Sequence, residues 1–286
     1  MNIFKTPQWV KSHIYKFESI NKIDDGVYHQ INLKLDAVQS SSPEVSIIIA
    51  AWNEEENIMN CISSLANLKT VIPFEIIVVN NNSKDGTQAI LERLHVRTLF
   101  QKIQGCGPAR QLGQEHAMGK YILLADADCI YAECWLDKMI SKLKTPDVVC
   151  VYGRYSFIDC PNYPRWQLYL LERMKDCVAE LRHFKRPYLN AYGISMGYIK
   201  DLGLKVKYVD YKIWGDDGRL CFDLMKYGKV KQVKANTARA WTYPRTLQRD
   251  GTLIIALRVR IKKECDRFFS LFIPHPPHDT KTSSND

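Results

Sequence analysis

An acidic pair, Asp126 and Asp128, is spaced for metal chemistry. The two residues directly follow the apolar run 121–125. Residues two apart on an extended segment face the same way, so both carboxylates can bind one hard cation such as Mg²⁺ or Mn²⁺. A cation held by one or two carboxylates leaves its other coordination positions to a diphosphate and water. The pair therefore predicts a metal site for a phosphate-containing substrate.

Two further polar clusters follow apolar runs in the same manner. They are the stretches 52–54 (Trp-Asn-Glu) and 80–83 (Asn-Asn-Asn-Ser). Each cluster has an ordinary structural alternative. Asn53 with Glu56 three residues on is nearly a capping box, and the segment 80–86 has the composition of any loop. Asp128 could likewise cap the helix that contains Trp135.

Buried strands are the elements that would position these clusters. The runs 45–50 and 75–79 are rich in β-branched residues and have the length of strands buried on both faces. The pattern of strand then helix continues with strands at 97–100 and 121–125, separated by a helix at 111–118. Such units predict an α/β fold with a mostly parallel sheet flanked by helices. Ligands bind at the carboxyl ends of parallel strands, so we expect the three polar clusters to converge there.

The order and spacing of these motifs resemble those of the family 2 glycosyltransferases, which have the GT-A fold. The similarity runs from about residue 45 to about residue 249. Its segments are 45–55 for the first strand and loop, 75–87 for the "DDxSxDGT" loop, 107–113 for "GxxxARNxG", 120–128 for the metal-binding "DxD" and 215–220 for the "ED" motif. The resemblance implies an inverting enzyme that moves a sugar from a nucleoside-diphosphate sugar to a glycan or a lipid-linked acceptor.

The resemblance also implies roles for individual residues. Those implied to bind the nucleotide are Ala50, Trp52, Glu54, Asn81, Arg110 and Asp126. Among them, Asn81 would meet the base and Arg110 would lie beside the nucleotide. For Arg110 the alternative is a surface ion pair.

Metal binding and base catalysis are implied for two acidic pairs. Asp126 and Asp128 would hold Mg²⁺ or Mn²⁺, and Asp217, with Asp216 beside it, would take the proton of the acceptor hydroxyl. For Asp216 and Asp217 the alternative is a solvated turn ahead of a helix.

The sequence departs from the family pattern at several positions. Asn80 and Asn81 replace an acidic pair, and because an amide can both accept and donate, the base is less certain than the family default of UDP. Cys129 stands where a third acidic residue is common, although a small buried thiol is its ordinary interpretation. The family's "QxxRW" motif is not found after Asp217, which argues against processive polymer synthesis. Tyr192, Trp214 and Trp241 could stack on sugars, or could be core residues.

Composition limits the partners and the compartment. The net charge of +9 over 286 residues favours phosphates, anionic lipid or nucleic acid as partners. We expect no nucleic acid, because no nucleic-acid-binding motif accompanies the charge. The longest apolar run, 45–52, is well short of the roughly 20 residues that a membrane helix needs. With no secretory signal and nine scattered cysteines, we expect a cytoplasmic enzyme, or one peripheral at the inner face of the membrane.

Four segments are expected along the chain. They are an N-terminal extension (1–44), a catalytic domain (45–249), a basic amphipathic helix (250–273) and a flexible tail (274–286). In the third segment apolar residues from Ile254 to Phe272 recur in steps of three and four, while Arg258 and Lys262 lie on other faces. This pattern is typical of a helix at an anionic membrane, but also of one packed on its own domain.

Other function classes were weighed on the same residues. A nucleotidyltransferase could use the same fold and metal pair, and a basic nucleic-acid-binding protein would explain the charge. The glycines at 105 and 107 invite a dinucleotide-binding interpretation, but Arg110 stands where the third glycine is required.

Overall fold

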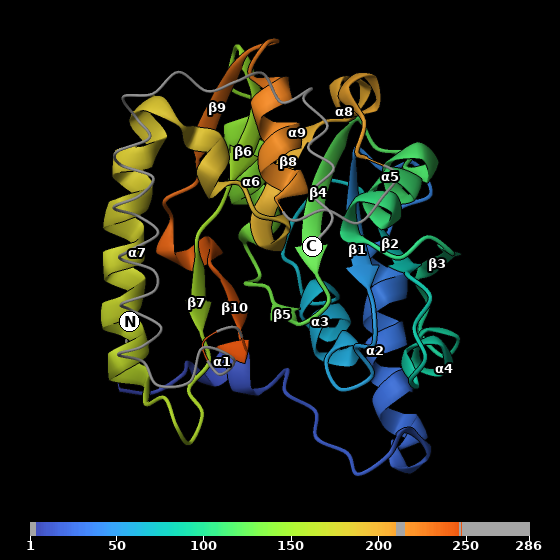
Figure 1. The fold of residues 1–286 in the computed structure, drawn as a ribbon. Coiled ribbons are helices and arrows are strands. Elements are labelled where there is room, and N and C mark those ends of the chain that lie inside the picture. Colours follow the sequence, from blue (N-terminus) through green and yellow to red (C-terminus); the bar gives the residue numbers. More distant parts are fainter. Residues whose placement is uncertain (1–3, 210–214, 246, 248–286) are drawn as a thin grey trace, which may run out of the picture. The chain divides into compact units, whose positions relative to one another are not determined.

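A seven-stranded sheet organises the part of the chain that the structure, a computed structural model, describes: residues 4–209, 215–245 and 247 (Figure 1). The chain divides into two units, and the first, Met1–Tyr243, contains both sheets. In sheet order the strands are β3 (Arg97–Phe100), β2 (Phe74–Asn80), β1 (Val45–Ala51), β4 (Tyr121–Asp126), β8 (Met196–Ile199), β6 (Val148–Tyr152) and β9 (Lys229–Gln232). β8 runs antiparallel to its neighbours β4 and β6, and the other pairs are parallel. The predicted mostly parallel α/β sheet is confirmed.

The central strands are buried on both faces, as their uniform apolar sequence requires. Alternate residues of β1 enter two different cores: Ile47 and Ile49 belong to one, Ile48 to the other. The first core is covered by α2 (Asp25–Val38), α3 (Ile58–Leu65), α4 (Thr87–Leu91) and α6 (Trp135–Leu143). The second is covered by α5 (Cys106–His116), α8 (Lys200–Val206) and α9 (Asp216–Leu224).

Helix α2 lies in the segment 1–44 and was not predicted. Its residues Tyr28, Ile31 and Leu35 are buried in the same core as β1. Asp24 begins the helix, because its side chain accepts a hydrogen bond of 2.6 Å from the N–H of Gly26. The extension therefore contributes to the core of the unit. A short helix, α1 (Gln8–Lys11), precedes it.

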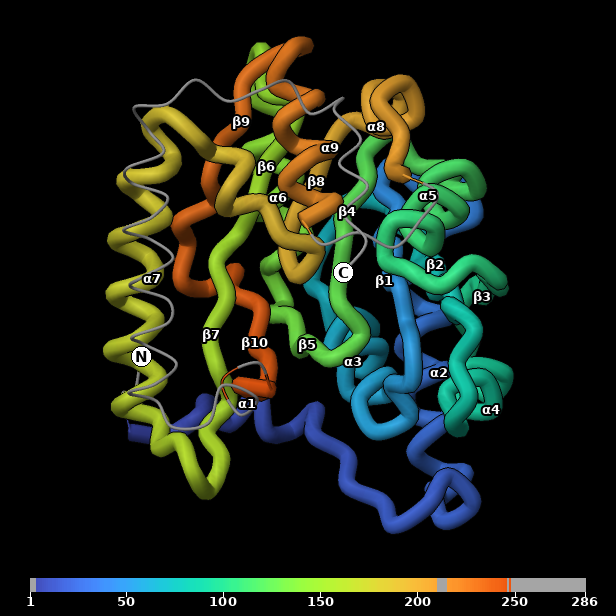
Figure 2. The backbone as a smooth tube through the Cα atoms, viewed as in Figure 1, coloured from blue at the N-terminus to red at the C-terminus, as the bar shows by residue number. Residues whose placement is uncertain are grey.

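A second, three-stranded sheet lies beside the first, and the sequence did not predict it. Its strands are β5 (Cys129–Ile130), β10 (Ala240–Thr242) and β7 (Tyr155–Phe157), with β10 in the middle. Figure 2 shows β10, far along the chain, entering between these two earlier segments. Helix α7 (Arg165–Lys185) packs along β7. Short 3₁₀ turns complete the unit: η1 (Ile20–Lys22), η2 (Pro187–Asn190), η3 (Gly193–Ser195) and η4 (Asn236–Ala238).

Several helix boundaries differ from those expected. Helix α3 begins at Ile58, and Asn53 has a left-handed backbone (φ 53°), so the capping-box interpretation is wrong. The N-cap of α6 is Cys134, so Asp128 does not cap that helix. Helix α5 begins at Cys106, five residues before the expected start at 111.

Some predictions fall outside the described residues. They are the amphipathic helix at 250–273, the tail at 274–286 and the role of Trp214. Within the described residues, no helix combines the length and the apolar character that a bilayer crossing requires.

Candidate active site

The carboxyl ends of β1, β2 and β4 meet at one edge of the sheet. Parallel register places Ala50 between Val79 of β2 and Asp126 of β4. The loops that follow are tied together: the N–H of Asn53 donates to Ser83 Oγ at 3.0 Å, and the N–H of Lys84 donates to Asn53 Oδ1 at 2.8 Å. The left-handed turn at Asn53 allows this exchange, because it aims the amide at the neighbouring loop. The three polar clusters thus share one edge, as expected.

Arg110 joins the two acidic pairs. Its guanidinium lies 3.0 Å from Asp126 Oδ1 at the end of β4 and 2.6 Å from Asp217 Oδ1 on the first turn of α9. Only 5% of Arg110 is exposed, so the surface ion-pair alternative is wrong. Asp216 is 3% exposed, so the solvated-turn alternative for its pair is wrong too. The buried guanidinium of Arg110 therefore brings together carboxylates that are far apart in the sequence.

Gly193 supplies a further hydrogen bond to Asp217. Its N–H donates to Asp217 Oδ2 at 2.8 Å, so each carboxylate oxygen of Asp217 has a donor. A Cβ at position 193 would lie 1.8 Å from Arg110 Nη2. Only glycine allows the backbone to approach this closely. No local sequence pattern signals this contact, because Asp217 and Arg110 are both distant from Gly193 in the chain.

Two carboxylates of the cluster are perturbed. Burial raises the pKa of Asp126 to about 7. The side chain is 37% exposed, and protein surrounds it on its remaining sides. Asp128 and Asp217 add to this rise in pKa, and Arg110 opposes it. Burial, reinforced by Asp217, raises the pKa of Asp216 to about 6, and among the described residues Asp216 Oδ2 has no hydrogen-bond partner. Among the same residues, the three carboxylates of Asp126, Asp216 and Asp217 share two guanidiniums, those of Arg110 and Arg219.

The residues suited to hold a metal are Asp126 and Asp128. One oxygen of each and Cys129 Sγ lie within 4.8 Å of one another. Burial and Asp128 raise the pKa of the Cys129 thiol well above its usual value, and Sγ donates to Asp128 Oδ1 at 3.2 Å. A protonated thiol is a poor ligand, while Mg²⁺ and Mn²⁺ prefer oxygen. The two carboxylates fit such a cation, and Cys129, 1% exposed, is the buried thiol that was expected.

The remaining nucleotide-binding candidates lie at the same strand ends. Ala50 and Glu54 are half-buried and Trp52 is exposed. Asn81 is buried: its Nδ2 donates to the carbonyl of Ile103 at 2.7 Å and its Oδ1 accepts from the N–H of Gly105 at 2.7 Å. Both ends of the Asn81 amide thus fix the loop that leads into α5. The contact between Asn81 and a base stays a prediction.

The aromatic candidates separate clearly. Trp241 is 2% exposed and its ring lies 5.0 Å from the guanidinium carbon of Arg165, so its proposed stacking on a sugar is wrong and its core role holds. Tyr192 is exposed and packs edge to face against Tyr155, with 6.4 Å between ring centroids. Tyr192 therefore remains a candidate for the acceptor side.

The mostly parallel sheet with a carboxylate-bearing strand end belongs to the GT-A fold class, which the solved structures named below share. Residues 46–203, more than half of the chain, match the model of glycosyl transferase family 2. The chain belongs to this family. It is 31% identical over 155 residues to the glycosyltransferase AglE of Haloferax volcanii, a match that covers 49% of this chain and 50% of AglE. The chain spans half or less of the length of the first curated relatives that it matches.

Solved structures share the fold at low identity. S. aureus TarS in complex with UDP-GlcNAc matches with a TM-score of 0.54 and 16% identity, covering 70% of this chain and 58% of that one. The mannosyltransferase PcManGT of Pyrobaculum calidifontis, in complex with GDP-Man and Mn²⁺, has the same TM-score and identity and covers 83% of this chain and 72% of its own. At such identity these likenesses establish the fold alone.

Proposed function

We propose that this chain is an inverting glycosyltransferase that moves a sugar from a UDP-sugar to a glycan or a lipid-linked acceptor. The observation that carries the proposal is the pair of contacts made by Arg110, which hold Asp126 and Asp217 on one guanidinium. Transfer needs a cation beside the leaving diphosphate and a base beside the acceptor hydroxyl. Carboxylates for both tasks lie at this one edge of the sheet.

In the proposed mechanism Asp126 and Asp128 hold Mg²⁺ or Mn²⁺. When bound, the cation neutralises the charge that develops on the nucleoside diphosphate. Oxygen ligands, the raised pKa of Asp126 and the excess of carboxylates all favour a cation here. The Mn²⁺ bound to PcManGT supports the same assignment, and the choice between the two metals is left to experiment.

Asp217 is the proposed base. Arg110 and the N–H of Gly193 fix the orientation of its carboxylate, and 16% of the side chain is exposed, so an acceptor hydroxyl can reach it. An inverting reaction needs the base on the face of the sugar opposite the leaving group. Asp216, buried behind it, is proposed to keep the first turn of α9 in place through its ion pair with Arg219.

The donor and the cellular context remain proposals. TarS was solved with UDP-GlcNAc and PcManGT with GDP-Man, so both bases occur on this fold. We propose UDP as the family default, with Asn80 and Asn81 as the feature that could change it. The cytoplasmic placement and an anionic membrane contact through 250–273 stay predictions from the sequence.

A donor screen tests this proposal. The protein is incubated with UDP-glucose, UDP-GlcNAc and GDP-mannose, with and without Mn²⁺, and release of nucleoside diphosphate is measured, with Asp217→Asn as the control. We expect metal-dependent release of UDP, and NMR of a glycoside product should show the anomeric configuration inverted. Formation of nucleoside triphosphate and sugar 1-phosphate when pyrophosphate is added, without release of nucleoside diphosphate, would identify a nucleotidyltransferase. A retained configuration would exclude the single-displacement mechanism.

A further inference from the structure

Helix α7 presents an apolar stripe to solvent. Its members, with their exposed fractions, are Trp166 (46%), Leu170 (54%), Met174 (48%), Leu181 (78%) and Phe184 (87%). Cys177, also exposed, fills the gap between Met174 and Leu181. Steps of three and four residues place all six on one face of the helix. A helix of 21 residues is about 31 Å long, so the stripe extends over most of that length.

The opposite face of α7 carries the charges. Arg165 and Glu172 form a fully buried ion pair of 2.9 Å, and Asp176 pairs with Arg239. The third carboxylate of the helix, Glu180, pairs with Arg154 and Lys234. The buried face of α7 thus combines these ion pairs with Leu168 and Leu171, yet α7 leaves five large apolar side chains exposed, which is unusual for a surface helix. Its apolar face has the composition of a surface that is covered when the protein works.

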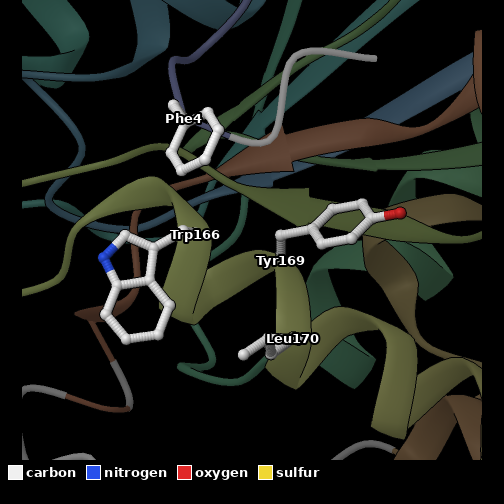
Figure 3. Close-up of a pocket in the computed structure, with 4 residues that line it drawn as sticks. All are labelled: Phe4, Trp166, Tyr169 and Leu170. Carbon is white, nitrogen blue, oxygen red and sulfur yellow. The ribbon is translucent and has the colours of Figure 1, made fainter.

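An open hollow continues the stripe at the amino-terminal end of α7. Phe4, Trp166, Tyr169 and Leu170 line it, and its volume is about 390 Å³ (Figure 3). Phe4 comes from the start of the chain and is 67% exposed. The exposed aromatic side chains of Phe4 and Trp166 thus lie side by side at this end. Exposed aromatic side chains favour the interface of a bilayer.

Exposed cationic side chains lie along this surface. Arg173 on α7 has 51% of its side chain exposed, Lys185 at the end of the helix is exposed, and Lys5 is exposed beside Phe4. The three carboxylates of α7 are held by cations, as described above. Exposed aromatic and aliphatic side chains flanked by cations are complementary to anionic lipid.

We propose that α7, together with Phe4, docks on an anionic membrane surface. A second copy of the chain fits this face less well for two reasons. A net charge of +9 on each copy opposes self-association. A stripe about 31 Å long and about 10 Å wide offers roughly 300 Å² per protomer, whereas a stable interface buries about 800 Å² per partner.

Vesicle co-sedimentation of the full-length protein tests the proposal. The probes are phosphatidylcholine vesicles with and without phosphatidylglycerol, at low and high salt. We expect binding only to the anionic vesicles, weakened by salt, and at least about tenfold weaker binding for Leu181→Ser/Phe184→Ser, because two large exposed apolar anchors are lost. Leu33→Ser/Val71→Ser is the matched control, since these exposed residues lie elsewhere and should leave binding unchanged.

Two further measurements separate the proposal from its rivals. Trp166 should be quenched by brominated lipid, and Trp166→Phe should remove that quenching. Ile261→Ser/Phe268→Ser tests the segment 250–273 in the same assay. Absence of binding to anionic vesicles, or loss of binding in that variant but not in the α7 variant, would overturn the proposal. So would a dimer in analytical ultracentrifugation that the α7 variant abolishes, if vesicles do not bind.

Discussion

Two groups of buried charged residues in this molecule differ in how their carboxylates are paired. At the strand ends, Asp126 and Asp217 share the guanidinium of Arg110, and the neighbouring Asp216 pairs with Arg219. Beneath α7, Glu172 pairs with Arg165, and Asp176 pairs with Arg239 and also lies near Arg154 and Arg173. Among the described residues, the carboxylates of the first group outnumber their guanidinium partners, whereas each of the two carboxylates of the second group has at least one guanidinium partner.

From this difference we infer that the first group is a functional site and that the second group stabilises the fold. Burying unneutralised carboxylates costs free energy, and a fold keeps such an arrangement where a bound cation or a reacting proton restores the balance. Carboxylates that each have a guanidinium partner need no further cation. Among the described residues, the donors without a hydrogen-bond partner in the second group are Nε of Arg154 and Nε and Nη1 of Arg165, and the Arg165 guanidinium lies over the Trp241 ring. Substitutions in the first group should therefore change activity and those in the second should change stability.

The largest expected effect is that of Asp217→Asn. Loss of the proposed base should lower kcat by at least about a hundredfold, near the low end of what general-base catalysis contributes, while UDP affinity stays nearly unchanged. Steady-state kinetics and calorimetry measure the two quantities. Asp223→Asn, on the same helix, is the control. If Asp217→Asn keeps more than about a hundredth of kcat, another residue is the base.

Glu172→Gln should have the largest effect in the second group. Glu172 accepts from Arg165, from Ser156 Oγ and from the N–H of Phe157 at 2.7 Å. Removing its charge leaves Arg165 buried without its partner, which typically costs about 3–5 kcal/mol of unfolding free energy. Urea unfolding measures the loss, with the exposed Glu133→Gln as control. A loss below about 1 kcal/mol, or a weaker affinity for UDP in the folded variant, would break the distinction between the two groups.

Asp128→Ala should abolish metal-dependent binding of the donor. Without its second carboxylate the proposed metal site loses a ligand, and UDP affinity in the presence of Mn²⁺ should fall at least about tenfold. UDP affinity without metal should change little. Calorimetry with and without Mn²⁺ tests this, with Asp201→Ala, on the surface of α8, as control. Unchanged affinity for UDP plus Mn²⁺ would exclude the metal role.

Lys175→Met should give the smallest effect and sharpen the account of the second group. Burial lowers the pKa of Lys175 to about 7 from an ordinary 10.5. Between these values the unfolded chain binds more protons, so wild-type stability should rise as pH rises from about 7 to about 10.5. The variant should lose this rise and should be more stable than the wild type at pH 7, by less than the shift in pKa alone would give, because the hydrogen bond from Lys175 to the carbonyl of Tyr155 is lost too. Urea melts across this pH range test the assignment, with Lys185→Met as control. If both variants keep the wild-type slope of stability against pH, the assignment is wrong.

The sequence predicted the elements that local pattern specifies. Strand β3 was expected at 97–100 and lies there, and the β-branched run at 45–50 forms β1, one residue longer. Uniform apolar runs of this length leave few alternatives to a buried strand. The strand-end clusters followed from topology, since parallel strands must end at the same edge.

What the sequence could not predict depends on distant partners. Strands of two or three residues, such as β5 and β7, carry no periodicity of their own. The apolar stripe of α7 would normally mark its buried face, yet Arg239, far along the chain, turns the charged face inward by pairing with Asp176. The contact of Arg110 with Asp217 joins residues 107 apart, and no local spacing encodes it.

The antiparallel strand β8 has a consequence for the order of folding. It pairs with β4, and Gly193 lies three residues before it, in η3. β8 follows β1, β2 and β4 in the chain, so during synthesis it can join the sheet only after they have emerged. The contacts of Gly193 and Arg110 with Asp217 can form together only after β8 has joined the sheet. A chain emerging from the ribosome would therefore present its proposed donor edge early, and its proposed base would remain out of place until almost the whole unit had been synthesised.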